Sequence, residues 1–203
     1  MANTKSTESL TFALSYGFVE GSAHGRKISK LLKRAGFAQA NSLAEADIII
    51  AHSAGCWLIP DNAQPKLMLY IGMPLPFTSA QKVWLEANWL SLKSVLAKGH
   101  VLKMISGAIL NTYYALRHPL RSRDIIRGAK TSTPTIFADA TTIFIANRYD
   151  PWPQSKRLLD YLKSENWAFI SLPGAHNNLW QHPAYYVEIV KNYAALLAKA
   201  NHR

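Results

Sequence analysis

A serine, an aspartate and a histidine stand in this chain where they could share one nucleophilic reaction. Ser53 lies in the segment Ala-His-Ser-Ala-Gly at 51–55, directly after three isoleucines at 48–50. The small residues two positions before and after Ser53 suit a sharp turn between a strand and a helix, which would expose the hydroxyl at the end of the strand. A serine hydroxyl is a weak nucleophile by itself, so the reaction also needs a base and a group that orients the base.

Asp150 and His176 are the candidates for these two partners. Asp150 ends the β-rich run at 141–150, and His176 ends the run at 167–176 after a Pro-Gly turn. Because the carboxyl ends of parallel strands meet at one edge of a sheet, we expect the three side chains to share one crevice. His176 would accept the serine proton, while Asp150 would fix the tautomer of the imidazole and stabilise its cation.

Each of these assignments has an alternative. A lone serine in such a pattern is more often a simple turn residue, and the partners downstream are what favour a nucleophile. Asp150 would otherwise cap the helix that follows it. Asp139 is the competing acid, but it precedes its strand, so we expect it at the opposite edge of the sheet. His182 precedes a helix and is interpreted as a turn residue.

The order of the apolar runs predicts the scaffold around these residues. Strands are expected at 10–16, 47–52, 66–72 and in the runs that lead to Asp150 and His176, with helices at 26–35, 154–164 and 183–199. Such alternation is typical of a mostly parallel sheet that is flanked by helices, the α/β class. The inward face of the last helix is expected to contain Tyr186, Ile189, Val190, Tyr193, Leu196 and Leu197.

Residues 77–133 interrupt this alternation with three expected helices, the third of which runs near 120–127 and ends at Gly128. We predict that this segment is an insertion within a single domain of residues 1–203. It contains nine Lys or Arg residues and two acidic residues, a difference of seven within the net charge of +11. The excess favours an anionic or amphiphilic substrate, and a solvated basic surface is the alternative.

Composition excludes several other classes of protein. With 49% hydrophobic and 17% charged residues the chain is globular, and no stretch approaches the ~20 apolar residues of a membrane span. The N-terminus is polar and lacks the apolar segment of a secretory signal. Cys56 is the single cysteine, which excludes an internal disulfide and favours a cytoplasmic location.

The sequence also predicts no cofactor and no nucleic-acid partner. No two histidines stand at metal-ligand spacing with a carboxylate on one helix, so we expect no metal. The basic residues are dispersed and accompany no nucleic-acid-binding motif, so nucleic acid is not expected as a partner. A small molecule is the expected ligand, and the oligomeric state is left open.

Three segments together resemble the α/β-hydrolase family: Ala-His-Ser-Ala-Gly at 51–55, Asn-Arg-Tyr-Asp-Pro-Trp at 147–152 and Pro-Gly-Ala-His-Asn-Asn at 173–178. The resemblance extends from about residue 10 to the C-terminal helix. It departs from the family pattern at Ala51, where glycine is usual, and at Tyr16-Gly17, where His-Gly is usual. Only about ten residues separate the first helix from the strand before Ser53, so a reduced strand count is expected.

The resemblance implies a serine hydrolase that cleaves a carboxylic ester or thioester through an acyl-enzyme on Ser53. Asp150 and His176 would complete a catalytic triad. The backbone N–H groups of Phe18 and Ala54 would form the oxyanion hole, which stabilises the negative charge of the reacting carbonyl oxygen. Acyl transfer to an alcohol or amine by the same triad is one alternative. Non-catalytic binding on a degenerate hydrolase scaffold is the other.

The same resemblance identifies further substrate contacts. Residues 77–133 correspond by position to a helical cap, in which Trp84 and Tyr113 would line an apolar pocket or only pack the cap onto the core. His24 lies in the loop nearest the expected oxyanion hole, and His52 lies next to the nucleophile. Both are candidate substrate contacts, with a surface role as the favoured alternative for His24 and a packing or tuning role for His52.

Overall fold

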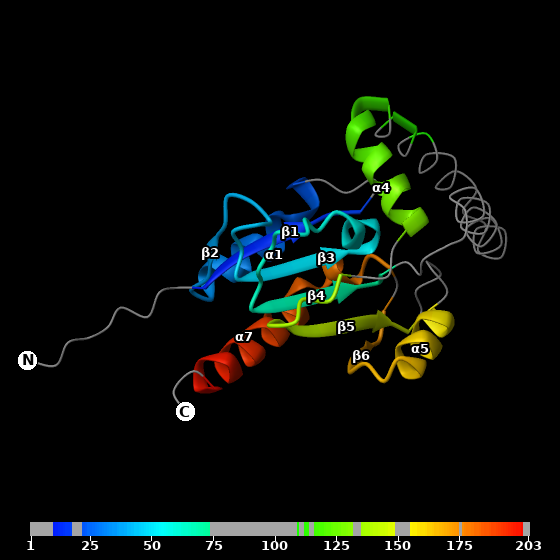
Figure 1. Cartoon of the computed structure of the whole chain (residues 1–203). Helices are drawn as coiled ribbons and strands as arrows, with labels where there is room; N and C mark the ends of the chain where they lie inside the picture. The colour runs from blue at the N-terminus through cyan, green and yellow to red at the C-terminus, as the bar shows by residue number, and fades with distance from the viewer. Residues whose placement is uncertain are drawn as a thin grey trace, which may run out of the picture.

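The computed structural model describes residues 10–17, 22–73, 109, 112–113, 116–131, 135–148, 155–174 and 176–200. Strands alternate with helices along these residues, and Figure 1 shows the strands lying side by side, with α4 beyond the ends to which their arrows point. The elements are β1 (Thr11–Ser15), α1 (Ser22–Arg34), β2 (Ala38–Gln39), β3 (Ile48–His52), the 3-10 helix η1 (Ser53–Trp57), β4 (Leu67–Ile71), α4 (Pro119–Thr131), β5 (Thr141–Asn147), α5 (Ser155–Ser164), β6 (Phe169–Leu172), α6 (Asn178–Gln181) and α7 (Pro183–Ala200).

The described strands form one six-stranded sheet in the order β2-β1-β3-β4-β5-β6, and every neighbouring pair is parallel. This confirms the α/β class that the alternation of apolar runs predicts. The two-residue strand β2 was not expected. It occupies the short connection between α1 and β3, where Ala38 pairs with Thr11 of β1. Two exposed residues carry no periodic signal, so their pairing depends on the neighbouring strand.

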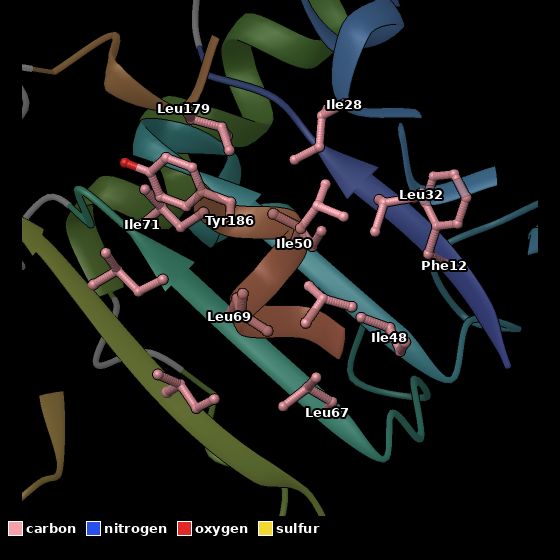
Figure 2. Packing of buried hydrophobic residues seen from close by; sticks show 14 residues of the cluster. Phe12, Ile28, Leu32, Ile48, Ile50, Leu67, Leu69, Ile71, Leu179 and Tyr186 are labelled. Carbon is pink, nitrogen blue, oxygen red and sulfur yellow. The ribbon is translucent and has the colours of Figure 1, made fainter. Parts of the chain in front are cut away.

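Alternate residues of the central strands pack on opposite faces of the sheet. In β3, Ile48 and Ile50 belong to a core cluster that also contains residues of α1, α6 and α7. Figure 2 shows this cluster between the sheet and α7, with Tyr186 directed at the strands. Ile49 and Ala51 belong to a second cluster on the other face, together with Leu162 of α5. The sheet is therefore buried on both faces, as in other parallel sheets.

Three details of the helices differ from expectation. Helix α1 begins at Ser22, earlier than the expected residue 26. Helix α4 continues through Gly128 to Thr131. Leu196 of α7 is 58% exposed and does not face the core, unlike the rest of the predicted stripe.

The reason for Gly128 is a close approach between α4 and η1. A Cβ atom at this position would lie 2.5 Å from the Cβ of Trp57, so no larger residue fits between the two elements. Ile125, one helical turn earlier, is also buried. The glycine was interpreted as a helix end because its packing role depends on a residue 71 positions away in the chain.

Of the other two helices expected within 77–133, the first lies outside the described residues. The second is described in part, and residues 109, 112–113 and 116–117 are helical there. No helix in the described part of the chain is both long and apolar enough to cross a membrane.

Candidate active site

Ser53 occupies a sharp turn between β3 and η1. Its φ is 54°, in the left-handed region, and Asn166 is the only other non-glycine residue with a positive φ in the described part of the chain. Such a backbone costs a non-glycine residue about 1–3 kcal/mol and persists only where its surroundings hold it. The turn expected from the small residues at 51 and 55 is therefore present, and it places the half-buried Ser53 just past the carboxyl end of β3.

The surroundings of the turn explain both small residues. A Cβ atom on Gly55 would lie 2.5 Å from the backbone oxygen of Ser15, because the end of β1 passes directly beside the turn. The Ser15 hydroxyl donates a hydrogen bond of 2.7 Å to the carbonyl oxygen of Gly55 and ties the two segments together. Ala51 is completely buried in the second core cluster, where its methyl group packs in place of the usual glycine.

The expected oxyanion donors lie on these two segments. Ala54 follows Ser53 at the start of η1 and is buried. Phe18 lies outside the described residues, but the backbone just before it is held by α4. The Nη2 atom of Arg121 donates hydrogen bonds to the carbonyl oxygens of Tyr16, at 2.7 Å, and Gly17, at 3.1 Å. The role of Phe18 and Ala54 stays a prediction.

Arg121 is one of the nine basic residues of 77–133 whose charge favours an anionic substrate in the sequence analysis. The structure makes it half-buried and bonded to the loop after β1. Arg117 remains exposed and donates to the Tyr113 hydroxyl at 2.8 Å. Tyr113 itself is 53% exposed, so its expected place in an apolar pocket stays a prediction.

His176 lies in the turn between β6 and α6, next to the Ser53 turn. His52 Nε2 donates a hydrogen bond of 2.8 Å to the backbone oxygen of His176, and the two ring centroids are 4.8 Å apart. Because the acceptor is a carbonyl, the His52 proton must be on Nε2. His52 immediately precedes Ser53, so this bond joins the segment of the expected base to the segment of the expected nucleophile. The structure brings these two regions together, and the roles of Ser53 and His176 stay predictions.

Trp180 is a residue that the sequence reasoning missed. Its ring on α6 lies 5.2 Å from that of His52, 5.9 Å from that of Tyr16 and 6.3 Å from that of His24. It therefore connects the end of β1, the start of α1 and the Ser53 turn. The only signal in the sequence is its position four residues after His176. The spacing places Trp180 close to His176 only because the short helix α6 follows the turn of His176.

His24 and His52, the two candidate substrate contacts, have different environments. His52 is completely buried beneath the turn of His176, which favours the packing or tuning role over a direct substrate contact. His24 is exposed on the first turn of α1. Trp84 lies outside the described residues, so its expected place in a pocket stays a prediction.

Asp150 also lies outside the described residues, but the strand that leads to it, β5, ends beside the end of β6. Asn147 at the end of β5 is in register with Leu172 at the end of β6, and the Arg148 N–H donates to the Leu172 carbonyl at 2.9 Å. The chain therefore leaves both strands at the same edge of the sheet. Asp139 is exposed in a turn before β5, at the opposite edge, as expected.

A buried polar network joins the end of β5 to α6 and α7. Asn178 Nδ2 donates to the Tyr186 hydroxyl at 3.0 Å, and that hydroxyl donates to Asn147 Oδ1 at 3.0 Å. All three side chains are buried, so each bond is protected from competition by water. Gly174 allows this packing, since a Cβ atom there would lie 2.5 Å from Asn178 Cγ. Asn178 follows His176 by two residues, so the network holds the loop of the expected base.

Comparisons with known proteins show the fold. No protein-family model and no curated protein matches the sequence. Among solved structures, the chain is similar to a carboxylesterase of the thaumarchaeon Nitrososphaera gargenis, with a TM-score of 0.60, 11% identity and coverage of 95% of this chain and 92% of that one. A second is the thioesterase RedJ from the prodiginine pathway of Streptomyces coelicolor, with a TM-score of 0.57, 12% identity and 89% coverage of both chains. A third is the pyrethroid hydrolase PytH, with a TM-score of 0.59, 14% identity and coverage of 94% and 99%.

Proposed function

Because the chain has the α/β-hydrolase fold, we propose that it is a serine hydrolase that cleaves a carboxylic ester or thioester. The observation that carries the proposal is the left-handed turn at Ser53, which lies against the backbone of His176 through the His52 hydrogen bond of 2.8 Å. Strain of this kind is concentrated at functional sites. A turn that only connected β3 to η1 would not need a serine in a left-handed conformation.

In the proposed reaction, His176 removes the proton of the Ser53 hydroxyl as its oxygen attacks the carbonyl carbon. The backbone N–H groups of Phe18 and Ala54 stabilise the oxyanion of the tetrahedral intermediate. His176 then returns the proton to the leaving alcohol or thiol, and the acyl group remains on Ser53. A water molecule releases the acid by the same route, and Asp150 orients His176 in both steps.

The remaining parts of the proposal concern the surroundings of the site. We propose that residues 77–133 form a cap within one domain, and the packing of α4 on η1 through Gly128 supports this. Trp84 and Tyr113 are its proposed substrate contacts. Cys56, the single cysteine, is buried and forms no disulfide, which fits the proposed cytoplasmic location.

Labelling with a fluorophosphonate tests the proposed nucleophile directly, because the reagent phosphonylates an activated serine hydroxyl. We expect one adduct per chain, and tryptic mass spectrometry should locate it on Ser53. Prior denaturation should abolish labelling, since activation depends on the folded site. Absence of an adduct on the native protein would favour the non-catalytic alternative. Release of an acylated alcohol or amine in place of the free acid would identify an acyltransferase.

His52 is expected to act on the reaction through His176. His52→Ala removes the donor to the His176 carbonyl, so kcat should fall by about 10- to 100-fold, the scale set by displacing a reacting group by about 1 Å. KM should change little, because His52 is buried and does not face the substrate. His52→Gln restores an N–H donor near the same position and should recover most of kcat. Steady-state kinetics with a nitrophenyl ester provides the measurement.

His24→Ala is the matched control for this prediction, and its kcat should stay near the wild-type value. His24 also contacts the Trp180 ring, but the bond to the His176 carbonyl comes from His52. If His52→Gln loses as much kcat as His52→Ala, the hydrogen bond does not position the base. Urea unfolding of each variant separates lost activity from lost stability.

A further inference from the structure

A groove of about 620 Å³ lies along the exposed side of α1 and is distinct from the Ser53 turn. Four of its lining side chains are cationic: Arg26, Lys30, Lys33 and Arg34. Ser29 and Tyr16 add polar groups, and the edge strand β2 contributes Gln39. The volume falls within the range of about 300–1,000 Å³ that is usual for small-molecule sites.

The charge pattern of α1 is unfavourable for the helix itself. The helix contains five basic residues and no acidic one. Lys30 stands four residues from both Arg26 and Arg34, and like charges at this spacing destabilise a helix by about 0.2–0.5 kcal/mol per pair. Lys33 and Arg34 lie in the last turn, where the helix dipole favours cations, so the unfavourable part of the pattern is the repulsion around Lys30. A bound anion would relieve this repulsion.

No acidic residue compensates these charges in the described part of the chain. The ion pairs found there join other residues, and none includes a cation of α1. Among the described residues, no acidic side chain lines the groove either. Several cations thus converge on one concave surface, where the potential of each adds to that of the others.

We infer that the α1 groove binds a small molecule with several phosphate groups. Guanidinium groups bind phosphate oxygens through paired hydrogen bonds, and lysine ammonium groups neutralise the remaining charge. The ligand is small because the basic surface is a groove along one helix of 13 residues, about 20 Å long, and not an extended stripe.

One end of the groove adjoins the proposed active site. Tyr16 lines the groove, its ring contacts Trp180, and its carbonyl oxygen accepts the Arg121 hydrogen bond at the loop that leads to Phe18. A phosphate group carried by the substrate would therefore lie in the groove while the ester carbonyl reaches Ser53. This location of the substrate rests on the proposed function, whereas binding of a free polyphosphate does not.

Inorganic tripolyphosphate is the probe, and calorimetry at low ionic strength is the measurement. We expect one saturable site on the full-length protein. Lys30→Glu, at the centre of the groove, should raise Kd by about tenfold or more, because a phosphate contact becomes a repulsion. Lys163→Glu is the matched control: it makes the same charge change on exposed α5, outside the groove, and should raise Kd by less than about threefold.

Melting temperatures of the variants show whether a loss of binding comes from a loss of folding. Lys30→Glu replaces four repulsive pairs, at spacings of three and four residues, with attractive ones, so its melting temperature without ligand should equal or exceed that of the wild type. Tripolyphosphate should raise the melting temperature of the wild type but not that of Lys30→Glu. Lys30→Gln should give an intermediate Kd. Absence of saturable binding, or an equal loss in Lys163→Glu, would overturn the inference and leave a solvated basic surface.

Kinetic measurements distinguish the two sources of phosphate. If the substrate carries it, Lys30→Glu should raise KM for a phosphate-bearing nitrophenyl ester about tenfold more than for a neutral ester of equal length. Tripolyphosphate should then inhibit the phosphate ester competitively. If tripolyphosphate binds in the groove without affecting either ester, the ligand is a free polyphosphate. Ser53→Ala should keep the wild-type Kd for tripolyphosphate, so failure of the serine mechanism would not be mistaken for failure of the groove.

Discussion

Ser53→Ala should lower kcat for a nitrophenyl ester by about 10⁴-fold or more while the fold stays intact. The substitution removes the attacking oxygen, but it leaves the Cβ carbon as a methyl group, at a turn that Ser15 and Gly55 hold from the other side. Circular dichroism and urea unfolding should therefore match the wild type. Wild-type turnover by the purified variant would show that another residue is the nucleophile.

Ser53→Gly extends the test to the backbone strain. It should be as inactive as Ser53→Ala but more stable by up to about 1 kcal/mol, because the left-handed conformation costs a side chain more than glycine. Asn166→Gly is the matched control, since Asn166 has a φ of 55° at the end of α5, away from the Ser53 turn. It should gain less stability, because asparagine tolerates the left-handed region better than serine, and it should keep full activity. A stability gain in Asn166→Gly alone would mean that the Ser53 turn stores no strain.

Asp150→Asn should lower kcat by about 10³- to 10⁴-fold, because an amide cannot stabilise the imidazolium of His176 and favours the wrong tautomer. The same substitution separates the catalytic role from the structural alternative. Asparagine caps a helix about as well as aspartate, so a residue that only capped α5 would tolerate the change. Initial rates report the catalytic role of Asp150, and thermal unfolding of the same preparation reports its role as a helix cap.

Asp139→Asn is the control for the choice of acid. Asp139 is exposed before β5, at the edge of the sheet opposite the Ser53 turn, so its substitution should leave kcat near the wild-type value. An inactive Asp139→Asn beside an active Asp150→Asn would reverse the assignment.

Local patterns in the sequence were enough to predict most of the elements. The isoleucines before Ser53 form a buried strand because a short β-branched run is stable when both faces of a sheet are covered. The small residues around Ser53 predicted the sharp turn, because bulk there would collide with adjacent backbone. The Pro-Gly turn before His176 likewise ends β6 close to its predicted position. Each of these signals depends on neighbours within a few residues.

Only the tertiary structure decided which side chains support the site. His52 was recognisable as the neighbour of Ser53, but its bond to the His176 carbonyl joins residues 124 positions apart. Arg121 was one basic residue among many until the structure placed it 105 positions from its acceptor at Tyr16. The cations of α1 were visible as a helix face, but a groove requires β2 beside them. Periodicity reports which face of an element is buried, whereas the identity of the partner depends on how the whole chain packs.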